Sequence, residues 1–329
     1  MVMTTLGEFD LIARYFTRKP RRAALGVGDD CALLAPLPPG QQLAVSSDML
    51  VEGRHFLCTV APERLGHKAL AVNLSDLAAC GAEPVAFTLA LALPRVDADF
   101  LEGFARGLFA LADEHAIELV GGDTTAGPLN ICITVFGAVP VGQALLRSGA
   151  RAGDALWVSH PAGGGLGDAR LALEVFRGQL VLPGEAFEAV RWRMERPTPR
   201  IALGLALRGV ASSAIDLSDG LVGDLGHMLA RSGVGATIDA DALPKSAWLA
   251  ALPRALQHEF GLAGGDDYEL LFSAPAGAEP EVLAAASQAA VAVTRIGRVE
   301  AAGGLRLVDR QGAPLPQSFA AFDHFSSAT

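Results

Sequence analysis

Lysine, cysteine and long apolar runs are scarce in this chain of 329 residues, and each shortage excludes a class of protein. With only three lysines and a formal net charge of −10, the chain lacks the basic surface that binds nucleic-acid phosphates. Its four cysteines show no C-x-x-C spacing, so neither a zinc site nor a disulfide framework is predicted. The uncharged, strongly apolar run from Pro84 to Pro94 is far shorter than the roughly 20 residues of a membrane-spanning helix.

The first residues also lack a basic region followed by an apolar core, so we expect no signal peptide. Scattered cysteines without a secretion signal are typical of reduced thiols in the cytoplasm. The sequence therefore predicts a soluble, cytoplasmic protein without nucleic-acid or membrane partners.

The order of strand and helix patterns indicates an α/β fold in two domains, 1–143 and 144–329, each long enough to form its own core. The boundary is placed where the composition becomes polar and glycine-rich, at 140–153. In the first domain we expect strands at 43–50, 85–91, 117–120 and 130–139, and helices at 7–16, 62–80 and 97–115. In the second we expect strands at 155–158, 213–216, 234–238, 270–273, 294–299 and 305–308, helices ending near 176, 208 and 231, and a helix at 279–290.

An aspartate, Asp76, interrupts the otherwise apolar and small-residue helix pattern of 71–81. Pro62 suits the first turn of this helix and Gly81 its end, so Asp76 belongs to its last turns. Asn73 lies three residues earlier and shares its face. Because an unpaired buried carboxylate is costly, Asp76 must be solvated, capped, paired or bound to a cation.

Nine aspartates fall inside motifs marked by glycine or serine, mostly at strand ends or helix starts: Asp29, Asp30, Asp48, Asp76, Asp123, Asp216, Asp219, Asp266 and Asp267. Any one of them alone is better explained as an N-cap or a turn residue. Taken together, converging carboxylates would repel one another unless a divalent cation such as Mg²⁺ lay between them.

Other phosphate chemistries lack their motifs. There is no G-x-x-x-x-G-K-[ST] pattern, and the H-R-D and D-F-G motifs of protein kinases are missing. No Cys/His or Ser/His pair at a recognised spacing points to a covalent nucleophile. Metal-assisted phosphoryl transfer remains, in which positioning and charge neutralisation supply most of the catalysis.

Six motifs in register closely resemble thiamine-monophosphate kinase, at 28–32, 46–56, 73–79, 121–124, 216–221 and 265–271. That family belongs to the aminoimidazole-ribonucleotide synthetase superfamily. The resemblance, which runs from residue 7 to residue 325, implies an α/β N-terminal domain whose sheet forms a shared barrel in a homodimer, and an α/β C-terminal domain. It also implies that the chain transfers a phosphoryl group in line from ATP to thiamine monophosphate with several Mg²⁺ ions.

The resemblance implies a role for each residue that matches a motif. Expected metal ligands are Asp30, Ser46, Ser47, Asp48, Asp76, Asp123, Asp216 and Asp219. Residues expected to contact ATP are Gly122, Asp123, Arg147 and Ser218. Residues expected to contact thiamine monophosphate are His55, Glu269 and Phe322.

Three of these residues also have a rationale of their own, beside a simpler interpretation. Arg147 could bind phosphate oxygens through its guanidinium, or be a surface arginine. His55 could donate a hydrogen bond to the substrate, or be a partly buried structural histidine. Phe322 could stack on a heteroaromatic cation, or simply be buried; the family often has glycine and tryptophan or tyrosine where this chain has Ala321 and Phe322.

Two alternatives remain open. The chain could be another ATP-using member of the superfamily, such as aminoimidazole-ribonucleotide synthetase, although selenophosphate synthetase and the hydrogenase-maturation carbamoyl dehydratase would need cysteines that this chain lacks. It could also be a non-catalytic, acidic metal-binding protein. The presence of all the acids together with Arg147 and Glu269 favours an enzyme.

Overall fold

The computed structural model describes residues 7–315 and 319. Contacts within the chain divide it into two compact units, one formed by Met1–Leu77 and Ala82–Gly142, the other by Ala78–Gly81 and Gln143–Thr329. Within the described part, no helix is long and apolar enough to cross a membrane. The mixed α/β architecture expected from the sequence is present in both units.

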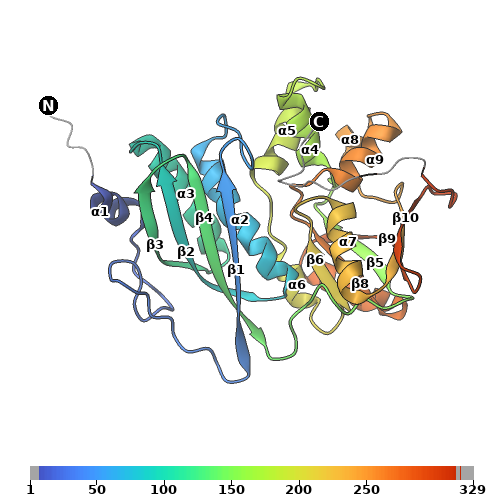
Figure 1. The fold of residues 1–329 in the computed structure, drawn as a ribbon, viewed down its shortest axis with the longest axis horizontal. Coiled ribbons are helices and arrows are strands. Elements are labelled where there is room, and N and C mark those ends of the chain that lie inside the picture. The colour runs from blue at the N-terminus through green and yellow to red at the C-terminus, as the bar shows by residue number, and fades with distance from the viewer. Residues whose placement is uncertain (1–6, 316–318, 320–329) are drawn as a thin grey trace. The chain divides into compact units, whose positions relative to one another are not determined.

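The first unit is built on a four-stranded sheet in the order β1-β4-β2-β3 (Figure 1). Its strands are β1 (Gln41–Val51), β2 (Glu83–Leu93), β3 (Glu118–Ala126) and β4 (Asn130–Pro140). Among the neighbouring strands only β2 and β3 pair in parallel; β4 is antiparallel to both β1 and β2. Its helices are α1 (Glu8–Leu11), continued by the π-helical η1 (Ile12–Phe16), α2 (Pro62–Ala79) and α3 (Ala98–Glu114).

The helices α2 and α3 lie along one face of this sheet, and glycines let them approach closely (Figure 1). A Cβ atom on Gly107 would lie 1.8 Å from the backbone oxygen of Glu63, and one on Gly66 would lie 2.0 Å from that of Phe104. Asp97 caps α3 as the sequence predicts, since its carboxylate accepts a hydrogen bond from the backbone N–H of Phe100 at 3.1 Å.

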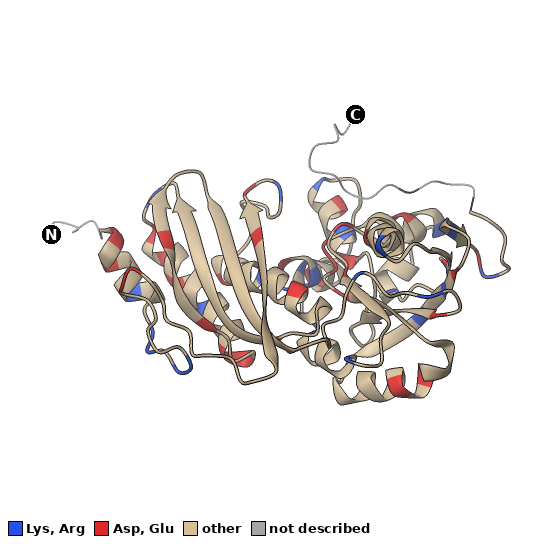
Figure 2. Cartoon of the chain, turned by 60° about the horizontal axis from the view of Figure 1, so that its bottom comes forward, with Lys and Arg blue, Asp and Glu red and all other residues tan. Residues whose placement is uncertain are grey.

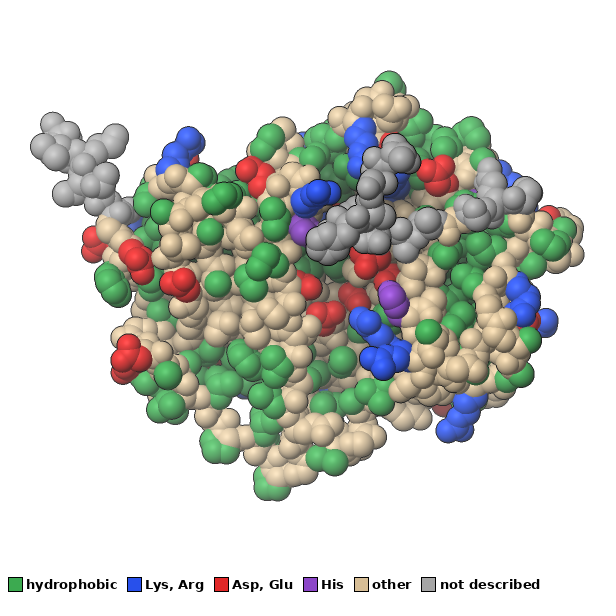
Figure 3. All heavy atoms as spheres, in the orientation of Figure 1, with side chains coloured by type: hydrophobic (Ala, Val, Ile, Leu, Met, Phe, Trp, Pro, Cys, Tyr) green, Lys and Arg blue, Asp and Glu red, His purple; other side chains and the backbone are tan. Residues whose placement is uncertain are grey.

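The opposite face of the sheet is open and apolar. Leu43, Val45 and Met49 alternate along β1 and are each about half exposed, at 48%, 56% and 53%. Figure 3 shows hydrophobic side chains on the part of the surface that these strands occupy in Figure 1. The four strands contain no lysine or arginine, and their charged residues are all acidic: Asp48, Glu83, Glu118 and Asp123. Figure 2 marks acidic residues in red along the chain.

The second unit is built on a six-stranded sheet in the order β10-β7-β9-β5-β8-β6. Its strands are β5 (Ala155–His160), β6 (Ser213–Asp216), β7 (Gly235–Asp239), β8 (Leu270–Ala274), β9 (Ala292–Glu300) and β10 (Gly304–Val308). Its helices are α4 (Asp168–Phe176), α5 (Gly184–Glu195), α6 (Ile201–Ala206), α7 (Leu221–Ser232), α8 (Ala247–Ala250), α9 (Arg254–Ala263), the 3-10 turn η2 (Ala276–Ala278) and α10 (Glu279–Gln288). Two apolar cores result, one between the sheet and α7 and one among α4, α5, α8 and α9.

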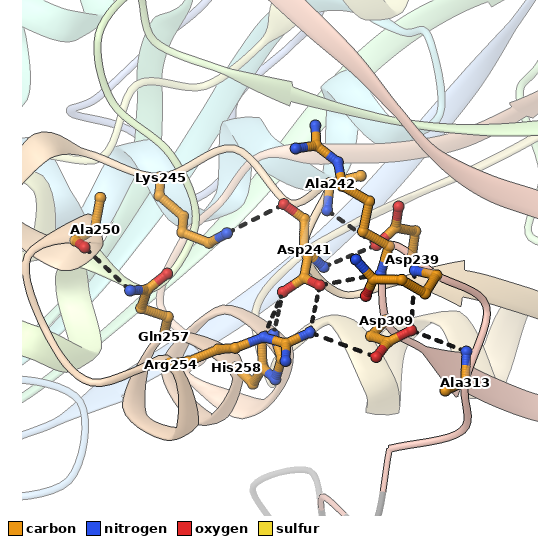
Figure 4. A network of polar contacts seen from close by, with 12 residues as sticks. Asp239, Asp241, Ala242, Lys245, Ala250, Arg254, Gln257, His258, Asp309 and Ala313 are labelled. Carbon is orange, nitrogen blue, oxygen red and sulfur yellow. Dashed lines mark hydrogen bonds and ion pairs between the residues drawn. The ribbon is translucent and has the colours of Figure 1, made fainter.

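In this unit, a network of ion pairs and hydrogen bonds surrounds Asp241 (Figure 4). The carboxylate of Asp241 accepts hydrogen bonds from both Arg254 and His258 of α9, the latter at 2.8 Å, and from the backbone N–H of Arg310 at 3.0 Å. The Arg254 guanidinium and these other donors hold the pKa of Asp241 well below its usual range, although burial opposes them. The network therefore ties α9 to the segments that follow β7 and β10.

The fold differs from the sequence prediction in several places. Strand β3 is longer than the predicted strand 117–120, since it continues through Gly121 and Gly122; it passes so close to β2 that a Cβ on Gly122 would lie 1.8 Å from the backbone oxygen of Leu89. The helices α8 and α9 were not predicted, and neither was α5, which lies between Pro183 and Pro197. Pro183 is the N-cap of that helix and Pro197 follows its end, so these prolines bracket a helix instead of excluding one.

Candidate active site

In the first unit, the Asp76 face of α2 meets strand β1. Asp76 accepts a hydrogen bond from the Ser46 hydroxyl, and Asn73 accepts one from the backbone N–H of Asp48 at 3.0 Å. The Asn73 amide also donates to the backbone oxygen of Ala69 at 3.0 Å, which fixes its orientation. The three-residue spacing on the helix and the two-residue spacing on the strand thus place Ser46 and Asp48 against Asn73 and Asp76.

Ser47 is not part of this group. As the residue between Ser46 and Asp48 it points to the open face of the sheet, where its hydroxyl donates to the backbone oxygen of Ile133 at 3.1 Å and lies 2.9 Å from the Thr134 hydroxyl. The structure therefore does not bring the Ser47 hydroxyl together with Asp76.

A pocket of about 560 Å³ in the first unit brings together three other predicted residues, Asp30, Gly122 and Asp123. Both aspartates are exposed. Asp29 shapes the turn before Asp30 by accepting a hydrogen bond from its backbone N–H at 2.9 Å. Apolar side chains complete the lining, among them Phe9, Ile12, Phe16, Val27, Leu89 and Leu119. The pocket therefore combines apolar walls with carboxylates.

In the second unit, the chain after β6 is hydrogen-bonded to the segment before β8. The backbone N–H of Leu217 donates to the oxygen of Glu269 at 2.9 Å, and that of Tyr268 donates to the oxygen of Leu217 at 2.8 Å. The N–H of Asp266 donates to the oxygen of Ser218, also at 2.8 Å. The motifs at 216–221 and 265–271, almost 50 residues apart in the sequence, are thus joined by backbone hydrogen bonds.

Asp224, which sequence reasoning did not select, joins this group. Its carboxylate accepts a hydrogen bond from the backbone N–H of Asp219 at 3.2 Å. Burial and the negative charge of Asp219 raise the pKa of Asp224 to about 7, while the positive charge of Arg147 acts in the opposite direction. Asp224 stands five residues after Asp219 in the first turn of α7, and that spacing was the available signal.

Glu269 is fully buried and already satisfied by basic partners. One carboxylate oxygen accepts from Ser159 and Arg200, both at 2.6 Å, and the other accepts from Arg193 at 2.8 Å and from Arg200 at 2.5 Å. A direct contact between Glu269 and a substrate would need one of these hydrogen bonds to exchange. The partner arginines lie 69 and 76 residues from Glu269 in the chain and were not predicted.

His55 is half-buried, and its Nδ1 accepts a hydrogen bond from the backbone N–H of Val51 at 3.0 Å. In the neutral ring the proton is therefore on Nε2, which is a donor. Phe322, the remaining predicted residue, lies outside the described residues.

The side-chain atoms that could bind a metal in each unit are oxygens, the ligand type that Mg²⁺ prefers. In the second unit the closeness of Asp219 and Asp224 fits a cation, since a positive charge there would relieve their repulsion. Among residues 7–315 and 319, no group of three or more His, Cys, Asp or Glu side chains is arranged to hold a metal alone.

Comparison with known proteins agrees with this geometry. Residues 28–139 match the AIR synthase related protein N-terminal domain, and residues 151–310 match its C-terminal domain. The thiamine-monophosphate kinase of Salmonella typhimurium is 47% identical over 98% of this chain and 99% of its own length, and that of Haemophilus influenzae is 42% identical over the same shares.

Solved structures give the same relationship. The thiamine-monophosphate kinase of Stenotrophomonas maltophilia superposes with a TM-score of 0.82 at 45% identity, covering 93% of this chain and 95% of that one. AaThiL, solved in complex with AMPPCP and TMP, gives a TM-score of 0.75 at 30% identity, over 89% and 90% of the two chains. The protein is thus a member of the thiamine-monophosphate kinase family, with the two domains of AIR synthase related proteins.

Proposed function

We propose that this protein phosphorylates thiamine monophosphate with ATP, giving thiamine diphosphate and ADP by direct in-line transfer. The observation that carries the proposal is the 47% identity to a thiamine-monophosphate kinase over almost the full length of both chains. A relative at 30% identity has been solved with the ATP analogue AMPPCP and with TMP, which supports the same pair of substrates.

In this proposal the nucleotide binds at the first unit's pocket, with Asp30, Gly122 and Asp123 at its polar side. Gly122 contributes exposed backbone to the pocket, and the apolar walls suit a base. Arg147 and Ser218 of the second unit are the other proposed ATP contacts. Arg147 suits phosphate oxygens because its guanidinium offers several fixed donors.

The proposed Mg²⁺ ligands are Asp30, Ser46, Ser47, Asp48, Asp76, Asp123, Asp216 and Asp219. Bound Mg²⁺ would supply charge neutralisation for the phosphates of both substrates. Ser46 orients Asp76 through its hydroxyl, and Asn73 holds the backbone of Asp48. Since the hydroxyl of Ser47 points to the other face of β1, its place in this set rests on the resemblance alone.

The acceptor is proposed to contact His55, Glu269 and Phe322. The acceptor phosphate is already ionised near pH 7, so the chain needs no strong base and no covalent nucleophile. His55 would donate from Nε2, because Nδ1 is occupied by the Val51 N–H. Glu269 would act mainly through Arg193, whose side chain is 17% exposed while Glu269 is fully buried.

The protein is further proposed to act as a cytoplasmic homodimer. The open sheet face with Leu43, Val45 and Met49 is the supporting observation, because exposed apolar patches of this kind mark protein interfaces (Figure 3). A second copy of the same sheet would cover this face.

The test is a coupled assay of the purified chain with ATP and Mg²⁺. ADP release and thiamine diphosphate formation are expected only when thiamine monophosphate is present, and unphosphorylated thiamine should give neither. ADP release that does not respond to thiamine monophosphate would refute the proposal. Sedimentation of the same preparation tests the dimer.

A further inference from the structure

We propose that Asp267 is a positioning residue for phosphoryl transfer: its buried carboxyl fixes the turn 265–268, and that turn holds Ser218 and Asp219 in place. The inference rests on the proposed function, because it assigns a role to a residue that supports the same site. Asp267 itself is placed away from substrate and acts through the backbone.

The turn has an unfavourable backbone. Asp266 has φ +63° and Tyr268 has φ +50°, so two residues with side chains, separated by one residue, occupy the left-handed region beside Gly265 at φ +69°. A non-glycine residue in this region is strained, and its conformation persists only where the surroundings enforce it. The turn therefore needs anchors that oppose its relaxation.

Asp267 is the anchor in the middle of the turn. Its side chain is 7% exposed, and both carboxyl oxygens lie within hydrogen-bond distance of the backbone N–H of Gly167, at 2.9 and 3.2 Å. Gly167 cannot shift easily, because it has φ +84° and a Cβ there would lie 2.7 Å from the backbone of Phe260. Asp267 thus joins the turn to a rigid point at the start of α4.

Glu269 is the second anchor, on the other side of Tyr268. Its carboxylate makes four hydrogen bonds with Ser159, Arg193 and Arg200, and its side chain has no exposed surface. Tyr268 is therefore held in its strained conformation by a fixed residue on each side. Burial raises the pKa of Asp267 well above its usual value, so an uncharged side chain with a hydrogen-bond acceptor suits the position.

The turn is hydrogen-bonded to the acidic motif at 216–219. Its backbone donates from Asp266 to Ser218 and from Tyr268 to Leu217, both at 2.8 Å. A Cβ on Gly265 would lie 3.0 Å from the Ser218 oxygen, so the two segments are also in close contact there. Relaxation of the turn would remove these hydrogen bonds and displace Ser218 and Asp219 together.

The test compares Asp267→Ala, Asp267→Asn and a matched control, Asp154→Ala, in the full chain. Asp154 is equally buried, at 5% exposure, and accepts one backbone N–H, from Arg151 at 3.0 Å. Asp154 precedes β5. Ser159, which donates to Glu269, lies near the other end of that strand, about 17 Å from Asp154 along the strand. Steady-state kinetics at several Mg²⁺ concentrations and amide hydrogen exchange of 216–219 and 265–269 are measured for each.

Asp267→Ala should lower kcat at least 30-fold and raise the Mg²⁺ concentration for half-maximal rate. It should also speed exchange at Leu217, Asp266 and Tyr268. Asp267→Asn should retain most of the activity, because its amide oxygen accepts from Gly167, and Asp154→Ala should keep the wild-type kcat. If Asp267→Ala yields no folded protein, Asp267→Ser, which is too short to reach Gly167, replaces it with the same expectation.

Two results would overturn the inference: unchanged exchange and kcat in the Ala or Ser variant, or an Asn variant as impaired as these. A wild-type chain without kinase activity would refute the proposed function instead, while the exchange measurement would still test whether Asp267 holds the turn.

Discussion

Replacing Asp168 by asparagine should stabilise the second unit near neutral pH and do so by an amount that depends on pH. Asp168 begins α4 and is 4% exposed, and its carboxyl accepts a hydrogen bond from the Ser246 hydroxyl at 2.5 Å. Burial raises the pKa of Asp168 to about 6, against the smaller opposing effects of Ser246 and the charge of Arg193. The folded state therefore prefers the protonated carboxyl.

The sign and size follow from proton linkage. A carboxyl with a pKa of about 3.9 in the unfolded chain and about 6 in the folded one gives stability that is lost as pH rises through this window. Two pKa units at 1.36 kcal/mol each correspond to about 3 kcal/mol over the whole titration, of which about 2 kcal/mol is lost between pH 4 and pH 7. Asparagine keeps an acceptor for Ser246 but does not titrate, so the difference in unfolding free energy between variant and wild type should grow by that amount.

Urea unfolding followed by tryptophan fluorescence at pH 4, 5, 6 and 7 measures this difference. The three tryptophans, Trp157, Trp192 and Trp248, all lie in the second unit, so the signal reports on the unit that contains Asp168. Comparing the two proteins at each pH removes the contribution of every other titrating group. A difference that is the same at all four pH values would refute the reasoning.

Asp241→Asn should show the other pH pattern: the stabilising effect of Arg254 on the carboxylate is complete above about pH 4 and lost as pH falls through the depressed pKa of Asp241, so the variant should lose about 2 kcal/mol equally at pH 8 and pH 9. A loss that changes across that range would contradict this. Asp219→Asn should lower kcat at least 100-fold without unfolding the chain, and near-normal turnover at saturating Mg²⁺ would exclude its role. His55→Ala should raise KM for thiamine monophosphate about tenfold, one lost hydrogen bond, with KM for ATP unchanged; the reverse pattern would assign His55 to the nucleotide. Gly122→Ala should cost about 3 kcal/mol by thermal unfolding and weaken ATP binding, because its Cβ would overlap the Leu89 oxygen, and wild-type stability would show that β2 and β3 can separate there.

Local signals predicted much of the fold. Proline at its start and glycine after its end predicted α2, and Asp97 was a correct N-cap. Alternation of apolar residues located most strands. The fold class, the family and the kinase activity of relatives were anticipated by six short motifs in register, which is a pattern spread over the whole chain.

The contacts that the sequence did not reveal depend on distant partners. Nothing near Glu269 in the sequence indicates that Arg193 and Arg200 would occupy its carboxylate, because these residues meet only after α5 and β8 have packed. The separation of Ser47 from Ser46 was available in principle, since adjacent strand residues face opposite sides. The resemblance implied that both serines bind metal, whereas their side chains lie on opposite faces of β1.

The pairing of β1 has a consequence for synthesis of the chain. Within the described residues, β1 pairs only with β4, which leaves the ribosome roughly 80 to 100 residues later, on the order of 4–20 s at ordinary rates of translation. The segment before β1 also lacks its hydrogen-bond partner until β3 has been made, since the backbone N–H groups of Arg21, Arg22 and Ala23 all donate to Glu118. Until β4 emerges, the apolar residues of β1 have neither a strand partner nor a finished sheet, so this interval is when the nascent chain most needs protection from aggregation.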